Sequence, residues 1–330
     1  MTSACIGRLS WWRGGSPRVA PAKHVQMLAK MPGLMFKGPL PPLSDRQAQI
    51  AARLEAHVRY LTDTIGPRNF KFYGPLQRSV EWLESELSQL GYTVERLPYV
   101  VDGQTFENLH TLNDQGPFTV IGAHYDSVYE CPGANDNGSA VAALLELARL
   151  LPHRRDLRFV LFTNEEPPFY KTRGMGSQVY VERLLEKVEP IQNMICLETM
   201  GFYTDKPGSQ RSPWADWLPT VGNFVAVAAD VQSCPLAKEV VGRWQSLVPF
   251  PCLGIAATPE TEFDLIQAGL GMSDHDSFWR AAIPAVMVTD TVFYRYAHYH
   301  TPEDTWEKLT YEPFARVVDG LAQVLSHPLV

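Results

Sequence analysis

Residues 118–166 read FTVIGAHYDSVYECPGANDNGSAVAALLELARLLPHRRDLRFVLFTNEE, and this stretch decides the fold. It begins with an apolar run over 118–123, continues with a helical pattern over 139–151 and ends with a second apolar run over 157–162. A strand, a helix and a strand in this order form a βαβ unit, which places two parallel strands in one sheet under a helix. We therefore predict an α/β protein.

The same alternation of strands and helices continues on both sides of this stretch. Further strands are predicted at 93–100, 108–112, 194–197, 224–229 and 285–288. Further helices are predicted near 76–90, 178–187, 236–247 and 313–325. Since buried parallel strands need helices on both faces, we expect a single-domain, three-layer αβα sandwich around a central mixed, mostly parallel sheet.

The folded domain is predicted to extend over residues 43–330. Ser44 and Gln47 form an S-x-x-Q capping box, and apolar residues follow at helical spacing. Residues 1–42 contain six Lys or Arg residues and no Asp or Glu, so we interpret them as a basic, flexible extension. A role at a membrane surface or as a transit-type peptide is the alternative. Residues 202–272 are a candidate insertion bordering the binding cleft, with plain surface loops as the alternative.

The composition excludes several classes of protein. The chain has 330 residues, of which 45% are hydrophobic and 20% charged, as in ordinary globular enzymes. A net charge of −7 without any Lys/Arg-rich run argues against a nucleic-acid partner. No apolar run reaches the roughly 20 residues of an integral membrane segment, and the absence of a visible signal peptide favours a cytoplasmic location without deciding it. The oligomeric state stays open.

The five cysteines are widely spaced and include no CxxC pair. A chain of this length does not need disulfides to stabilise its core, so we interpret them as free thiols. A disulfide between Cys234 and Cys252 is the alternative.

Polar side chains with catalytic potential follow the predicted strands. They are His124 and Asp126 after 118–123, Glu165 and Glu166 after 157–162, Glu198 after 194–197, His300 after 285–288, and Asp136 before the helix 139–151. Taken singly, each has an ordinary structural explanation, such as a helix cap or a solvated edge. Because ligands bind beyond the carboxyl ends of the strands in an open α/β sheet, we expect these side chains to share one crevice.

Imidazole and carboxylate groups without thiolate suit zinc and related divalent cations. We predict two Zn²⁺ ions, with other divalent metals as the alternative, and Asp136 as the ligand that both ions share. One ion is expected on His124, Asp136 and Glu198, and the other on Asp136, Glu166 and His300. A pair of cations of this kind lowers the pKa of water and polarises a carbonyl oxygen.

Three further residues have predicted roles beside these ligands. Glu165 is expected to point away from Glu166 and to act as the general base, which takes a proton from water and passes it to the leaving amine. Asp126 is placed to orient His124, with turn formation as the alternative. Tyr299 is a candidate donor to the developing oxyanion, with core packing as the alternative.

The motifs resemble those of metallopeptidase family twenty-eight, the dinuclear zinc aminopeptidases, whose relatives include glutaminyl cyclases, carboxypeptidases and receptor-type domains. The resemblance extends from about residue 43 to the C-terminus and is carried by HYDS, PGANDNGSA, FTNEEPP, ICLETMGFY, SDHDSFW and YHTPEDT. It implies an eight-stranded mixed sheet between helices, the same five metal ligands, Glu165 as the base and a cis peptide between Asp136 and Asn137.

The chain departs from the family pattern at a few positions. Glu198 stands where the family more often has Asp, which bears on the geometry and occupancy of the first metal site. Asn137 and Ala140 also differ from the usual residues. Asp274 and His275, in SDHDSFW, are expected on the substrate side or behind the ligands, and we do not assign them as metal ligands.

The sequence therefore predicts a zinc-dependent exopeptidase, namely an aminopeptidase that cleaves N-terminal residues from peptides with Glu165 as the general base. A glutaminyl cyclase is the enzymatic alternative. The resemblance implies that such an enzyme holds one zinc ion and has Trp at the position of Tyr299, which argues against this alternative. A non-catalytic, peptidase-like binding domain is the alternative from another class, although every ligand position here holds a competent residue. Side-chain specificity and the preference for amino or carboxyl ends stay open.

Overall fold

The computed structural model describes residues 26–27, 31–113, 116–152, 154–211, 219–258 and 269–329. Most of the extension 1–42, including Cys5, lies outside these ranges. The prediction that the extension is flexible therefore concerns mainly residues outside the described part of the chain.

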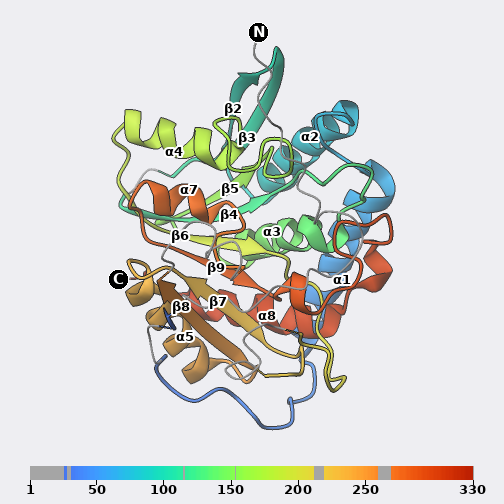
Figure 1. Cartoon of the computed structure of the whole chain (residues 1–330), viewed down its shortest axis with the longest axis vertical. Coiled ribbons are helices and arrows are strands. Elements are labelled where there is room, and N and C mark those ends of the chain that lie inside the picture. Colours follow the sequence, from blue (N-terminus) through green and yellow to red (C-terminus); the bar gives the residue numbers. More distant parts are fainter. Residues whose placement is uncertain are drawn as a thin grey trace.

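The described strands form one nine-stranded sheet in the order β1-β8-β7-β9-β6-β4-β5-β3-β2 (Figure 1). They are β1 (Gln26–Met27), β2 (Val94–Val101), β3 (Gln104–Thr111), β4 (Phe118–His124), β5 (Leu157–Phe162), β6 (Ile191–Glu198), β7 (Val225–Ala229), β8 (Cys252–Thr258) and β9 (Ala285–Thr289). Eight of them make up the sheet that the family resemblance implies, and the two-residue β1 adds a ninth strand at one edge.

The sheet is mixed, with its parallel strands at the centre. Strands β5, β4, β6 and β9 are parallel neighbours, and Ile121 of β4 is paired with Phe159 of β5 and Ile195 of β6. Antiparallel pairs follow on both sides, where β3 joins β5 and β7 joins β9. The carboxyl ends of the four central strands therefore open at the same edge of the sheet.

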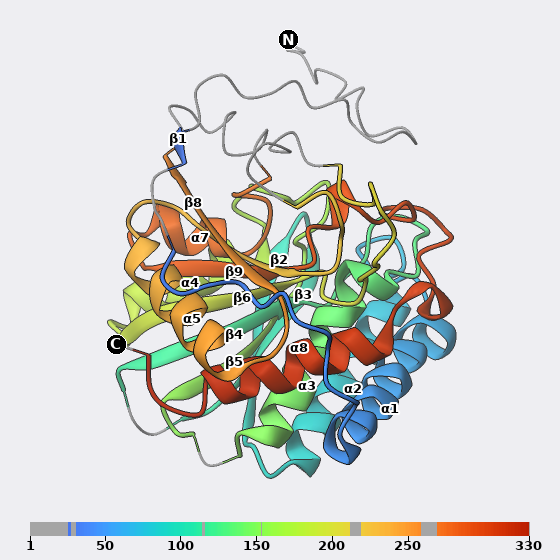
Figure 2. The same cartoon turned by 90° about the horizontal axis from the view of Figure 1, so that it is seen from below.

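Helices cover both faces of the sheet (Figure 2). The described α-helices are α1 (Asp45–Arg59), α2 (Tyr73–Gln89), α3 (Ala140–Leu150), α4 (Gly176–Glu186), α5 (Cys234–Leu247), α7 (His275–Arg280) and α8 (Tyr311–Val324). Shorter helical turns are η1 (Tyr60–Ile65), η2 (Ala134–Ser139), η3 (Val292–Tyr294) and η4 (Trp306–Lys308). The predicted capping box begins α1, because Ser44 Oγ accepts from the backbone N–H of Gln47 at 3.2 Å.

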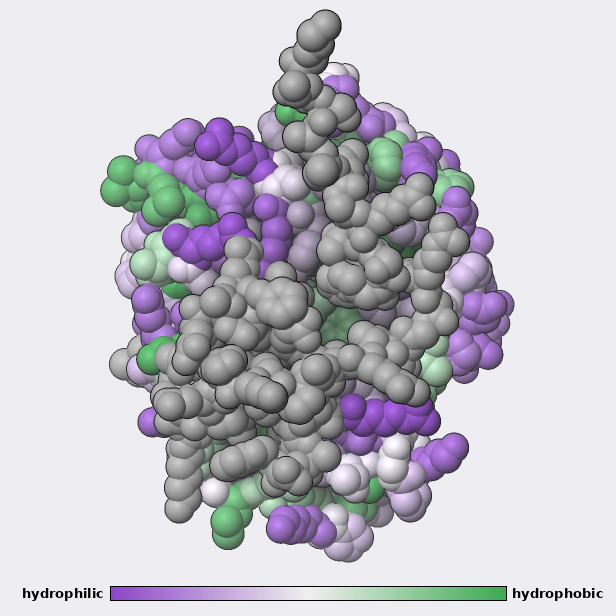
Figure 3. Space-filling view, in the orientation of Figure 1, coloured by the Kyte–Doolittle hydropathy of each residue, from purple (hydrophilic) through white to green (hydrophobic). Residues whose placement is uncertain are grey.

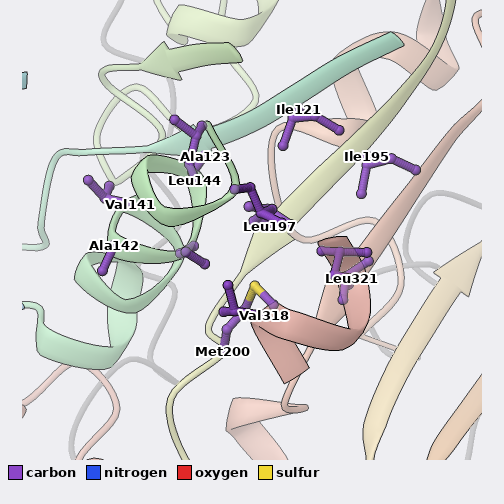
Figure 4. Packing of buried hydrophobic residues seen from close by; sticks show 14 of the residues in the cluster. Ile121, Ala123, Val141, Ala142, Leu144, Ile195, Leu197, Met200, Val318 and Leu321 are labelled. Atoms are coloured by element: carbon purple, nitrogen blue, oxygen red, sulfur yellow. The ribbon is translucent and has the colours of Figure 1, made fainter. Parts of the chain in front are cut away.

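Alternate residues of the central strands enter two different cores. Ile121 and Leu197 face α3 and α8, where they pack with Leu144 and Leu321 (Figure 4). Val120, on the opposite face of β4, belongs to the core that includes residues of α4 and α7. Strands buried on both faces are typical of a parallel sheet between helical layers, and the predicted αβα sandwich is confirmed.

Several details differ from the sequence prediction. Residues 225–258, within the candidate insertion 202–272, form β7, α5 and β8 and are part of the main sheet and its helical layer. Strand β8 and helix α7 were not predicted, because a short apolar run and a six-residue helix carry little periodic signal. Cys234 and Cys252 are free thiols, as are Cys131 and Cys196, so the alternative disulfide is wrong.

No described helix is both long and apolar enough to cross a membrane. On the face seen in Figure 3, hydrophilic residues dominate the side formed by α1 and α2. A hydrophobic area lies over the end of α4, where Leu185 and Val188 are exposed.

Candidate metal centre

The predicted site residues converge at the carboxyl ends of the central strands. His124 and Glu198 are the last residues of β4 and β6, and Asp136 lies in the turn η2 that precedes α3. Glu166 lies in the loop after β5, and His300 lies in the loop after η3. The four candidate ligands other than His300 are buried, and the His300 side chain is only 11% exposed.

The first group of possible metal ligands consists of His124, Asp136 and Glu198. His124 Nε2 lies 3.3 Å from Asp136 Oδ1 and 3.5 Å from Glu198 Oε2. Each atom bound to a tetrahedral zinc lies about 2.0 to 2.1 Å from the ion, which places ligand atoms roughly 3.3 Å from one another. These three side chains therefore fit a single cation.

The second group consists of Asp136, Glu166 and His300. His300 Nε2 lies 2.8 Å from Asp136 Oδ2 and 3.2 Å from Glu166 Oε1. Asp136 belongs to both groups and turns one carboxylate oxygen towards each imidazole. The structure thus brings the five predicted side chains together in two adjoining groups, with Asp136 common to both.

Asp304, which the sequence analysis did not single out, holds the turn that carries Asp136. Its buried carboxylate accepts from the backbone N–H of Asn135 at 2.9 Å and of Asp136 at 3.2 Å. The hydroxyl of Tyr296 donates to the same carboxylate at 2.7 Å. The peptide between Asp136 and Asn137 is cis, as the family resemblance implies. The YHTPEDT motif thus contributes Asp304 as well as His300.

Glu198 is held by two neighbours. Ser273 Oγ donates to Glu198 Oε2 at 2.6 Å, and Asn137 Nδ2 donates to the same oxygen at 3.3 Å. The SDHDSFW segment therefore contacts the candidate ligand Glu198 through Ser273. His275 is occupied elsewhere, since its Nε2 lies 2.5 Å from the carbonyl oxygen of Leu270.

Asp126 connects His124 with the two glutamates. Its Oδ1 lies 3.4 Å from His124 Nδ1, and its two oxygens accept from the backbone N–H groups of Glu165 and Glu166, each at 3.2 Å. The preceding residue, Asn164, has a φ of 58°, in the left-handed region, so the chain turns sharply before the pair. Glu165 Oε2 lies 3.9 Å from His124 Nε2, whereas Glu166 faces His300.

Tyr299 packs on one of the candidate ligands. Its ring stacks on the ring of His300 with centroids 3.7 Å apart, and it makes a T-shaped contact with the ring of Phe293, with centroids 4.8 Å apart. Burial raises the pKa of Tyr299 well above its ordinary value, and the carboxylates of Asp136 and Glu166 raise it further. Its phenol therefore keeps its proton at neutral pH and is able to donate it in a hydrogen bond.

Burial and mutual charge shift the pKa values in this site. Burial raises the pKa of Glu166 to about 7 and that of Glu165 well above its ordinary value. Burial alone would lower the pKa of His300, but Glu166 and Asp136 outweigh it and raise the pKa to about 10. Without bound cations, proton binding to the imidazoles of His124 and His300 therefore offsets part of the carboxylate charge, and cations that bind there would displace those protons.

The chain resembles known proteins in sequence. The family model for peptidase family M28 matches residues 109–325. An uncharacterized protein of Escherichia coli, YfbL, is 37% identical over 289 residues, which cover 83% of this chain and 87% of YfbL. The aminopeptidase YwaD of Bacillus subtilis is 30% identical over 209 residues, which cover 60% of this chain and 38% of YwaD. The chain thus spans well under half the length of that aminopeptidase.

Solved structures share the fold. The aminopeptidase LapA of Legionella pneumophila has a TM-score of 0.61 at 19% identity, and the match covers 89% of this chain and 78% of the LapA chain. The zinc aminopeptidase BSAP of Bacillus subtilis has a TM-score of 0.61 at 17% identity, and the match covers 86% of this chain and 95% of the BSAP chain. A glutaminyl cyclase of Porphyromonas gingivalis has a TM-score of 0.60 at 18% identity, and the match covers 84% of this chain and 97% of the cyclase chain.

Proposed function

The chain belongs to peptidase family M28 and is a peptide hydrolase, and on that premise we propose that it is a zinc-dependent aminopeptidase that releases N-terminal residues from peptides. The observation that carries the proposal is Asp136, whose two carboxylate oxygens face separate imidazoles in two adjoining groups of possible ligands. Aminopeptidases among the sequence relatives and zinc aminopeptidases among the solved structures support the choice.

We assign the metal ligands as they were predicted. His124, Asp136 and Glu198 would hold one zinc ion, and Asp136, Glu166 and His300 would hold the other. When bound, the two ions would lower the pKa of water and polarise the carbonyl group of the substrate. Asp126 would keep the His124 ring in place from the side opposite to the ligand nitrogen.

Glu165 is the general base in this proposal. Its carboxylate lies beside the first ligand group, 3.9 Å from His124 Nε2, without belonging to either group. Burial, together with the neighbouring Glu166 and Glu198, raises its pKa, so the carboxylate gains affinity for a proton. Glu165 would take a proton from the attacking water and deliver it to the amine that leaves.

Tyr299 is the proposed donor to the oxyanion. The stacking of its ring on His300 holds Tyr299 against a residue of the second ligand group. A hydroxyl that keeps its proton at neutral pH would hydrogen-bond to the oxygen on which charge develops.

The first experiment measures the release of free leucine from a short peptide that begins with leucine. The purified protein is assayed before chelator dialysis, after it, and after zinc is added back. Release that the chelator abolishes and zinc restores would support the proposal. If zinc binds but no leucine appears, the same protein is tested for cyclisation of a Gln-initiated peptide, and cyclisation would replace the aminopeptidase proposal.

A further inference from the structure

Arg68 and Asn69 lie in the connection between η1 and α2, and they are buried beneath the loop that leads from His124 to Asp136. Arg68 is 0% exposed and Asn69 is 4% exposed. A fully buried guanidinium is costly unless its donors are hydrogen-bonded. The hydrogen-bond partners of Arg68 and Asn69 therefore indicate the role of these buried side chains.

Every hydrogen bond of the Arg68 side chain goes to a backbone carbonyl. Arg68 Nε donates to Tyr125 O at 2.6 Å, Nη1 to Pro132 O at 2.6 Å and Nη2 to Gly133 O at 3.1 Å, while Nη1 also lies 3.4 Å from Gly66 O. Tyr125 directly follows His124, and Gly133 comes three residues before Asp136. The guanidinium thus ties together the two ends of the segment that separates these ligands.

Asn69 and the backbone of Arg68 hold the middle of the same segment. Asn69 Nδ2 donates to Ser127 O at 2.8 Å and to Tyr129 O at 2.7 Å. The backbone N–H of Ser127 donates to Arg68 O at 2.9 Å, and Arg68 N–H donates to Ser127 Oγ at 3.1 Å. Residues 68–69 therefore contact the segment 125–133 at its start, middle and end.

The turn that carries Asp136 closes tightly on this guanidinium. Gly133 has a φ of +65°, and its carbonyl accepts from Gly138 N–H at 3.0 Å as well as from Arg68. A Cβ at Gly133 would lie 2.4 Å from Asp136 O, and one at Gly138 would lie 2.6 Å from Gly133 O and 3.6 Å from Arg68 Nη2. Little space is left in which the turn could adjust.

An arginine suits this position better than a lysine. Its planar group offers five N–H donors that diverge in fixed directions, whereas the three donors of an ammonium group leave from one point. Tyr125 O and the Pro132 and Gly133 carbonyls are reached from different nitrogens of the guanidinium. A lysine at position 68 would leave at least one of these carbonyls without its donor.

We propose that Arg68 and Asn69 are positioning residues of the metal centre, which hold the segment between His124 and Asp136 so that zinc binds a pre-arranged pair of ligands. The inference rests on the proposed function and deepens it. It also assigns a role to a part of the chain that lies before the residues 109–325 matched by the family model.

The test compares Arg68→Lys with Arg158→Lys. Arg158 is also a buried arginine, 6% exposed, but it bonds to Asn113 and Glu189 and is paired with Val120 of β4, four residues before His124. Zinc affinity is measured by competition with a chromophoric chelator, and thermal unfolding is recorded for the zinc-free and zinc-loaded proteins. Both variants are expected to unfold at lower temperature than the wild type, but only Arg68→Lys is expected to bind zinc at least tenfold more weakly.

A second variant, Asn69→Ala, removes the two hydrogen bonds to Ser127 O and Tyr129 O, together with the two that Asn69 Oδ1 accepts from the backbone N–H groups of Lys71 and Phe72, and keeps the charge of Arg68. It is expected to weaken zinc binding at least threefold, and it decides the question if Arg68→Lys does not fold. Wild-type zinc affinity in Asn69→Ala and in any folded Arg68→Lys would overturn the inference, as would an equal loss of affinity in Arg158→Lys. Failure of the wild-type protein to bind zinc would instead contradict the proposed function.

Discussion

Asp136 Oδ2 lies 2.8 Å from Nε2 of His300, so a turn before α3 meets a loop from the last part of the chain. The other oxygen of Asp136 faces His124 at 3.3 Å. Within the part of the chain that the structure describes, Asp136 is the residue common to both groups of possible metal ligands. Its substitution is therefore expected to affect both metal ions, whereas substitution of any other ligand should affect mainly one.

The first prediction concerns Asp136→Asn. An amide has one oxygen and no charge, so it cannot offer an anionic oxygen to each of two cations. We expect fewer than one zinc ion per chain, against two in the wild type, and a loss of peptidase activity of about a thousandfold or more. Zinc content is measured by elemental analysis after gel filtration. Asp319→Asn, which changes a carboxylate between α1 and α8 that bonds to Arg46, is the control and should keep both ions. Two ions in Asp136→Asn would contradict the shared-ligand assignment.

The second prediction separates the general base from its neighbour. Glu165→Gln should lower kcat by about a hundredfold to ten-thousandfold, the usual contribution of a general base, and should leave the zinc content unchanged. Glu166→Gln is the matched variant and should lose zinc, because Glu166 lies in a ligand group and Glu165 does not. Leucine release and zinc content are measured on the same preparations. A loss in kcat below about tenfold in Glu165→Gln would exclude it as the base.

The position of the site was predictable because it follows from a simple property of parallel sheets. His124, Glu198 and the Glu165–Glu166 pair each follow a strongly apolar run, and the carboxyl ends of parallel strands meet at one edge. Periodicity also located the helix that follows Asp136. These signals are local in sequence, so they survive without knowledge of the tertiary structure.

The residues that support the site were not predictable in the same way. Arg68, Asn69, Ser273 and Asp304 act through hydrogen bonds to backbone groups or ligands that lie far away in the sequence. Neither spacing nor residue type distinguishes such contacts from ordinary loop chemistry. Asp304 and Ser273 do lie in the motifs YHTPEDT and SDHDSFW, which is the signal that would have singled them out, whereas Arg68 lies in none of the quoted motifs.

The third prediction uses the unusual length of Glu198. In Glu198→Asp the carboxylate would be withdrawn by one methylene, so it could not reach both Ser273, now at 2.6 Å, and the ion beside His124. The zinc ion of the first group should bind about ten- to a hundredfold more weakly, and the ion of the second group should keep its affinity. A two-step zinc titration resolves the two ions. Equal weakening of both steps would contradict this separation.

The fourth prediction concerns the stability of the zinc-free protein at different pH values. The pKa of His300 is raised from 6.5 to about 10, and burial raises that of Glu166 from 4.5 to about 7. At these two groups the folded protein therefore binds more protons than the unfolded chain, so their contribution to the free energy of unfolding falls as the pH rises. The contribution of His300 is fully present below pH 6.5 and is lost as the pH rises through about 10.

Thermal unfolding at pH 6, 7, 8 and 9, with chelator or with zinc, checks this prediction. If the folded state binds one proton more than the unfolded state, the free energy of unfolding changes by about 1.4 kcal/mol per pH unit. For a chain of this size, this change corresponds to roughly 2 °C in Tm per pH unit. Since zinc replaces the protons, the gain in Tm on adding zinc should grow with pH. His300→Asn should flatten the dependence of the zinc-free protein. A zinc-free Tm that rises from pH 7 to 9 would contradict the assigned proton binding.

The last prediction tests Tyr299, whose ring has a structural contact and whose hydroxyl has a proposed catalytic one. Tyr299→Phe keeps the stacking on His300 and removes only the donor. If the phenol stabilises the oxyanion, kcat should fall by about a hundredfold, while KM and zinc affinity stay within about threefold of the wild type, since the lost interaction forms only in the transition state. Tyr92→Phe removes a hydroxyl that donates to Ala148 O, away from the site, and should leave kcat unchanged. A kcat for Tyr299→Phe close to that of Tyr92→Phe would reduce Tyr299 to a packing residue that supports the His300 ring.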